Sequence, residues 1–199
     1  MNLFNYTNFD PFEKDNYKDN FNKIKQVNKE SLANGFLMRK SPFFVWFYFR
    51  NKDKIESTFR EKNKKIKQML LIDLYDKVKK EAKSDNICTH PNDELSAGAA
   101  FMSLLSFGAI YGLNSTEIID NMKLLYDSKF AVKEDKIIEN YFWDEINFYE
   151  KEKTFIDTTY YEYFTQGDRN VFYNMGYYVH ALRLTLFYLY HFDKIKEEK

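Results

Sequence analysis

The chain is poor in the residues that crosslink a fold or make it rich in turns. Its single cysteine, Cys88, leaves no second thiol for an internal disulfide, which fits a reducing compartment. Six glycines and three prolines are too few for the frequent tight turns of an all-β protein. We therefore expect a helical fold that is stable without a disulfide.

Long hydrophobic runs are also missing. The two longest, Pro42–Phe49 and Leu184–Tyr190, are far shorter than the roughly 20 residues that span a membrane as a helix. Met1–Asp10 does not resemble a signal peptide, because no basic stretch precedes an apolar core. The sequence predicts a cytoplasmic protein with no membrane partner.

Common catalytic and metal-binding patterns are absent as well. The chain has no glycine-rich phosphate loop, no Gly-x-Ser-x-Gly motif and no zinc-ribbon spacing. His180 and His191, if they lie on one helix, are about 16 Å apart, which is too far to share a metal ion. We predict that the protein is not an enzyme and has no catalytic, cofactor-binding or metal-binding residue.

Aromatic residues are abundant. They make up 19% of the chain, with 20 phenylalanines and 16 tyrosines, and such large rings must be buried or meet a partner. The 44% hydrophobic and 30% charged fractions are typical of a globular domain. A chain of this length buries about 70% of its unfolded surface, which is enough for a stable core.

Start and stop signals predict an all-α fold, an irregular bundle of about seven helices. The single domain is expected to cover residues 1–199, and a loop at 84–93 separates its N-terminal and C-terminal helical parts. The expected helices begin near Asp10 and then cover 41–49, 52–83, 95–111, 114–125, 133–151, 154–166 and 168–196.

Hydrophobic patterning predicts which helices are buried. The run at 43–49 is apolar on all sides, so we expect it to be buried completely. Within 52–83 one stripe should face the core, comprising Ile55, Phe59, Ile66, Met69, Leu70, Leu74 and Val78. The helix at 95–111 is rich in glycine, alanine and serine, whose small side chains permit close backbone approach. We expect it to be the central helix of the bundle.

Strong boundary signals flank that helix. Asn92 or Asp93 is expected to cap its N-terminus, and Gly112 to end it. Asn114 and Glu117 have the spacing of a capping box, which predicts the start of the next helix. A small-residue helix, a tight turn and a capped helix from Asn92 to Met122 resemble part of some helical immunity proteins of bacterial toxin systems. The resemblance implies a protein that occludes the active site of a cognate toxin.

Charge is separated along the neutral chain. Arg50–Lys83 carries twelve basic against six acidic residues, and Lys133–Asp168 carries four basic against ten acidic residues. Tyrosines lie among these acidic residues, and both favour an interface with a basic partner. The predicted partner-binding residues are Asp144, Glu145, Glu150, Glu152, Asp157, Tyr160, Tyr161, Glu162 and Tyr163. The expected partner is a protein, for instance a basic toxin domain; alternatively, these acids pair with the basic segment within the fold.

Two other functions stay open. The basic segment 50–83 would suit a nucleic-acid-associated accessory protein of a mobile element. Arg169, Asn170 and His180 resemble the Arg-Asn and His residues of helical ribonucleases of the HEPN type, which would make a cryptic site with Arg183. That family places the arginine and the histidine one to two helical turns apart, whereas His180 here lies farther along the chain.

Overall fold

The computed structural model describes residues 22–23, 25–33, 35–38, 40–86, 89–128, 132–151 and 177–192. These residues form helices and no sheet, apart from one isolated bridge between Ala33 and Tyr177. The all-α prediction is confirmed. The elements are α2 (Gly35–Met38), α3 (Lys40–Arg50), α4 (Lys52–Arg60), α5 (Lys64–Asn86), α6 (Asp93–Tyr111), α7 (Ser115–Tyr126), α8 (Lys133–Lys151) and α10 (Tyr178–Tyr190).

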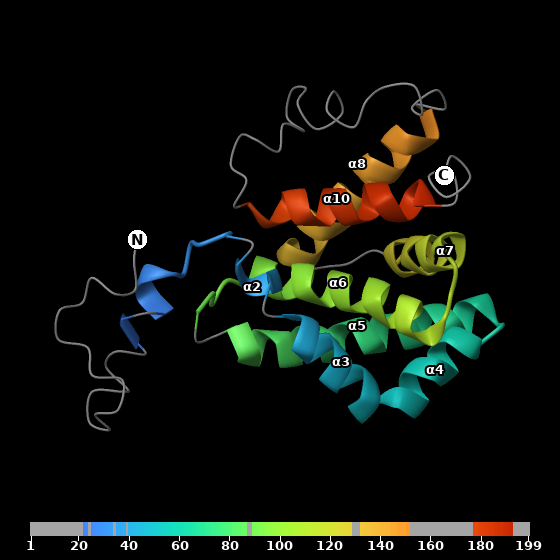
Figure 1. Cartoon of the computed structure of the whole chain (residues 1–199), viewed down its shortest axis with the longest axis horizontal. Helices are drawn as coiled ribbons and strands as arrows, with labels where there is room; N and C mark the ends of the chain where they lie inside the picture. Colours follow the sequence, from blue (N-terminus) through green and yellow to red (C-terminus); the bar gives the residue numbers. More distant parts are fainter. Residues whose placement is uncertain are drawn as a thin grey trace.

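Helix α6 lies in the middle of the bundle (Figure 1) and contacts α3, α4, α5, α7, α8 and α10. Its small residues are buried, and Ala97, Ala99 and Ala100 have no exposed surface. The predicted central helix is thus confirmed. By length and composition alone α6 is long and apolar enough to span a membrane. However, 67% of its apolar stretch is buried inside the protein, as in a core helix.

The predicted boundaries of α6 and α7 are confirmed in atomic detail. Asn92 is the cap of α6, since its side chain accepts a hydrogen bond from the Glu94 amide. Gly112 ends α6 in the left-handed conformation at φ 95°, and the Leu113 amide donates to the Gly108 carbonyl at 2.9 Å. The bond from the Leu113 amide is the one that characterises a Schellman motif at a helix end. Asn114 and Glu117 form the expected capping box.

The stripe predicted for 52–83 is only partly correct. The chain breaks at 61–63, between α4 and α5, and Ile66 and Met69 are exposed. At about 100° per residue, Ile66 lies about 80° and Met69 about 140° around the helix from Leu74, so both leave the face that Leu74 occupies. The residues of α5 that face the core are Leu71, Leu74, Tyr75, Val78 and Ala82. The α5 helix also continues to Asn86, into the predicted loop at 84–93.

Charged contacts join the two oppositely charged segments. Lys79 of α5 lies 2.7 Å from Asp135 of α8, which is buried and accepts a second hydrogen bond from the Tyr75 hydroxyl at 2.9 Å. Part of the predicted charge separation is thus neutralised inside the fold. Helix α8 has the bounds that its sequence pattern predicts, Lys133–Lys151. The predicted helix at 154–166 and residues 168–176 of the last one lie outside the described residues.

Candidate partner-binding surface

The run at 43–49 within helix α3 is apolar on all sides but is buried on one side only. Phe44, Phe47 and Tyr48 face the core, whereas Val45 and Phe49 are 49% and 63% exposed. Trp46, also on the outer face, is 47% exposed. The prediction that this run is buried completely is therefore wrong. Because α3 lies at the edge of the bundle (Figure 1), the other helices cover only its inner face.

The inner face holds α3 firmly against the central helix. The Phe47 ring stacks on Phe107 of α6 with centroids 5.6 Å apart and an interplanar angle of 9°. Tyr48 packs against the same ring at 5.9 Å. The exposed side chains of α3 consequently project from a helix that is anchored in the core.

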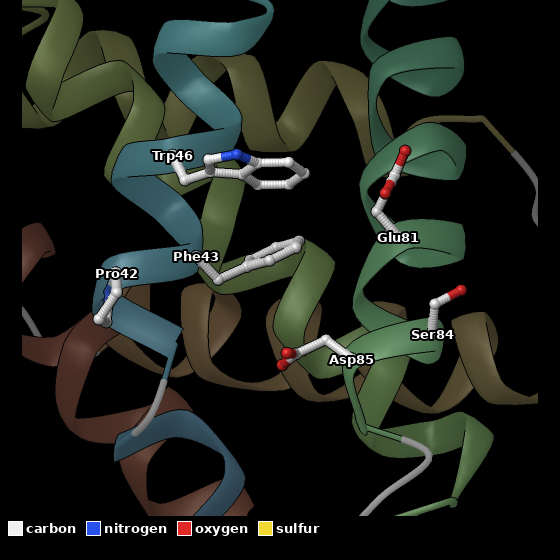
Figure 2. Close-up of a pocket in the computed structure, with 6 residues that line it drawn as sticks. All are labelled: Pro42, Phe43, Trp46, Glu81, Ser84 and Asp85. Atoms are coloured by element: carbon white, nitrogen blue, oxygen red, sulfur yellow. The ribbon is translucent and has the colours of Figure 1, made fainter.

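A groove of about 430 Å³ separates the outer part of α3 from the C-terminal half of α5 (Figure 2). Pro42, Phe43 and Trp46 line it from α3, and both rings extend toward α5. The other wall is polar and consists of Glu81, Ser84 and Asp85 of α5. One apolar wall thus faces one acidic wall.

The two rings of the apolar wall belong to a stack that runs along α3. The Lys40 ammonium lies 4.7 Å from the centroid of the Phe43 ring, and the Arg50 guanidinium lies 4.9 Å from that of Trp46. Between the cations, the Phe43 and Trp46 centroids are 6.0 Å apart. The spacing of these four residues, three to four positions, places them on one face of the helix. The stack holds both rings in place.

The two carboxylates of the acidic wall differ in their partners. Asp85 forms an ion pair with the ammonium of Lys40, which is fully buried. Glu81 is half-buried and has no ion pair among the residues that the structure describes. Ser84 donates its hydroxyl proton to the Lys80 carbonyl at 3.3 Å. Of the two carboxylates, only Glu81 lines the groove with no compensating cation among the described residues.

The predicted acidic site on α8 is divided by the fold. Asp144 is exposed, and Glu150 pairs with Lys123 of α7 at 2.7 Å. Glu145 is buried, with its carboxylate 3.0 Å from Arg183 Nε and 2.9 Å from the Tyr149 hydroxyl. The prediction that Glu145 contacts a partner is wrong, because position 145 lies on the inner face of α8. Glu152, Asp157, Tyr160, Tyr161, Glu162 and Tyr163 lie outside the described residues.

Among the residues of the cryptic-site alternative, His180 is buried, Arg183 is partly buried, and the others lie outside the described residues. His180 is buried and packs edge-on against Tyr177, with centroids 5.7 Å apart. Arg183 forms the ion pair with Glu145 and lies 5.7 Å from the centroid of the Tyr141 ring. Arg169 lies outside the described residues. Thus the contacts seen for His180 and Arg183 are packing and ion-pair contacts of the bundle.

Tyrosines in this region hold their protons tightly. Burial, a hydrogen bond donated to Glu94 and the charge of Glu94 raise the pKa of Tyr178 well above its usual value. Burial and the hydrogen bond with Tyr141 likewise raise the pKa of Tyr177. Neither hydroxyl would ionise near neutral pH, so these two groups suit packing rather than acid–base chemistry.

The outer face of α3 and its groove were missed by sequence reasoning. The signal was present in the spacing of Lys40, Phe43, Trp46 and Arg50, in which cations flank two aromatic residues on one helical face.

Among the residues that the structure describes, no group of three or more His, Cys, Asp or Glu side chains is placed to hold a metal ion. No family model matches the chain, and neither a curated protein nor a solved structure matches it.

Proposed function

We propose that this chain is a non-enzymatic protein-binding module and that its partner binds the outer face of α3. The observation that carries the proposal is the row of exposed large side chains, Val45, Trp46 and Phe49, beside an open groove. A contiguous apolar patch on a folded protein is costly to leave in water, and such patches mark interaction sites.

The rigidity of the patch supports the proposal. Phe47 anchors α3 to α6, and the cation stack holds Phe43 and Trp46. A partner would lose little free energy in ordering side chains that are already fixed. Tryptophan is also enriched among the residues that dominate binding energy at protein interfaces.

A role as an immunity protein is the more specific form of the proposal. A helical protein that binds tightly through a preformed surface can block a toxin by covering its active site. A basic toxin domain would be attracted to carboxylates such as Glu81 and the exposed Asp144. Such a complex would protect cells from that toxin, whereas another binding module would not.

The test begins with purification of stoichiometric partners of the tagged chain, with nuclease present, and measures their affinity for variants. We expect Trp46→Ala with Phe49→Ala to weaken binding by about 30-fold or more, the range of a dominant interface residue. Ile66→Ala with Met69→Ala is the matched control, because these apolar side chains are exposed on α5. If Tyr160→Ala with Tyr163→Ala weakens binding and the α3 pair does not, the α3 proposal is refuted.

Nucleic-acid binding is a second candidate, favoured by one observation. Lys62, Lys64 and Lys65, around the start of α5, are exposed and form no ion pair within the described part of the chain. Free lysines on a surface suit phosphate contacts, whose affinity falls steeply with salt. If this function is correct, replacing Lys62, Lys64 and Lys65 with glutamine should abolish binding to a labelled DNA or RNA duplex in an anisotropy titration. Unchanged binding would exclude this patch.

A further inference from the structure

We infer that the groove between α3 and α5 binds an amphipathic helix of the partner, whose apolar side chain packs on Phe43 and Trp46 and whose arginine or lysine pairs with Glu81. This inference rests on the proposed function and specifies the chemistry of the partner. The argument combines the geometry of the rings, the charge of the opposite wall and the arrangement of the helices.

The geometry of the rings decides which group can bind the apolar wall. Lys40 lies over Phe43, Arg50 lies over Trp46, and the two rings pack on each other. A further cation would find these positive charges already in place, so the rings are poorly suited to hold one. Their edges point toward α5 (Figure 2) and offer an apolar surface. An aliphatic side chain therefore fits this wall better than a cation.

The charge of the opposite wall decides what accompanies that side chain. The Asp85 charge is offset by Lys40, whereas Glu81 has no ion pair among the described residues. A neutral or acidic partner that closed the groove would remove water from Glu81 and leave its charge unpaired, which is costly. A cationic side chain beside the apolar anchor removes that cost and supplies specificity.

The arrangement of the helices indicates a helical partner. Both α3 and α5 pack on α6, and the groove lies between them. A partner helix lying between them would insert its side chains in the manner of helix-in-groove recognition. The half-buried ring of Phe43 and the exposed rings of Trp46 and Phe49 rise along α3 by about 4.5 Å each, which resembles the spacing of anchors on a partner helix.

The test uses two synthetic helical peptides of about five turns that share one leucine stripe. Arginines flank the stripe in one peptide, and glutamates replace them in the other. The full chain is labelled with 5-fluorotryptophan, and its two tryptophan signals are assigned with Trp143→Phe. We expect the arginine peptide to shift the 19F NMR signal of Trp46 until it saturates. The binding curve should show that this peptide binds about tenfold more tightly than the glutamate peptide.

Two variants separate this inference from the proposed function. Glu81→Gln should reduce the preference for arginine about fivefold or more, whereas Asp120→Asn, an exposed carboxylate on α7, should leave it unchanged. If Trp46→Ala weakens binding of the native partner but Glu81→Gln leaves the preference for the arginine peptide unchanged, the inferred ion pair is refuted. The proposed function then stands. If neither peptide shifts Trp46 and Trp46→Ala leaves the native complex intact, both are refuted. A dimer of this chain that Trp46→Ala dissociates would assign the groove to a second copy and overturn the inference.

Discussion

Helices α3 and α6 are both dominated by apolar residues, yet they differ completely in burial. Helix α6 has small side chains and contacts six other helices, so nearly every position from Leu95 to Gly108 is buried. Helix α3 has large aromatic side chains and is covered on one face, so Trp46 and Phe49 remain exposed. Apolar composition alone does not determine burial. Burial also depends on how many other helices pack against the helix, and small side chains let more helices pack closely.

The largest expected effect tests the buried environment around α6 with alkaline pH. Burial raises the pKa values of Tyr75, Tyr126 and Tyr178 above that of an unfolded tyrosine, near 10. Above that pH the unfolded chain loses protons that the folded chain keeps, so stability falls as pH rises. Three such groups predict a loss of about 4 kcal/mol per pH unit.

Urea unfolding measured from pH 8 to about 11.5 checks this prediction, with tyrosinate absorbance as a second signal. Tyr126→Phe should reduce the slope by about one third, since it removes one of three groups. Tyr188→Phe, which removes the hydroxyl of an exposed tyrosine, is the matched control. A stability that stays flat across this range would show that these hydroxyls are not buried as the structure has them.

The next effect compares the two faces of α3. Phe47→Ala should destabilise the protein by about 3–5 kcal/mol, because the ring is 1% exposed and stacks on Phe107. Phe49→Ala, two positions away on the outer face, should cost less than about 1 kcal/mol. Chemical denaturation of both variants gives the two values. Equal losses would mean that α3 is covered on both faces.

A smaller effect compares α3 with α6 through the addition of volume. Ala99→Leu or Ala100→Leu should cost about 1–3 kcal/mol, because both positions are fully buried against other helices. Val45→Leu enlarges an exposed side chain of α3 and should change stability by less than about 0.5 kcal/mol. Thermal and urea unfolding provide the comparison. Tolerance of leucine at both alanine positions would contradict the close packing of α6.

The smallest expected effect on stability belongs to Glu81, the residue inferred to pair with the partner. Glu81→Gln removes a charge that has no ion pair among the described residues, so stability should change by less than about 0.5 kcal/mol. Asp85→Asn is the informative contrast, since it leaves the buried Lys40 without its carboxylate. That variant should lose markedly more stability in the same urea measurement. Similar losses for the two variants would mean that Lys40 does not depend on Asp85.

Local signals in the sequence predicted the helix boundaries well. Asn92, Gly112 and the Asn114–Glu117 box work through hydrogen bonds between near neighbours, so their geometry follows from spacing alone. The bounds of α8 were predicted for the same reason. Nothing in the structure tests the predicted roles of Asp144 and Glu150, and the predicted residues after 151 lie outside the described residues, so all of these stay predictions.

The exposure of individual positions did not follow from spacing. Glu145 was grouped with Asp144 because both are acidic neighbours, but adjacent residues on a helix point about 100° apart. Glu145 therefore turns inward to Arg183, while Asp144 remains in water. The outward faces of Trp46, Phe49 and Ile66 were missed for a related reason, since a pattern shows which residues share a face but not whether another helix covers it.

The sequence by itself determined the helical class, the caps around α6 and the small-residue character that makes α6 central. These properties depend on backbone propensity and on contacts within a few residues. Only the tertiary structure decided that α3 is covered on one side, that Lys40 neutralises Asp85 and that Glu81 lines the groove with no ion pair among the described residues. Each of these depends on segments about 40 residues apart in the chain being brought together by α6, and no local pattern encodes which faces then remain open.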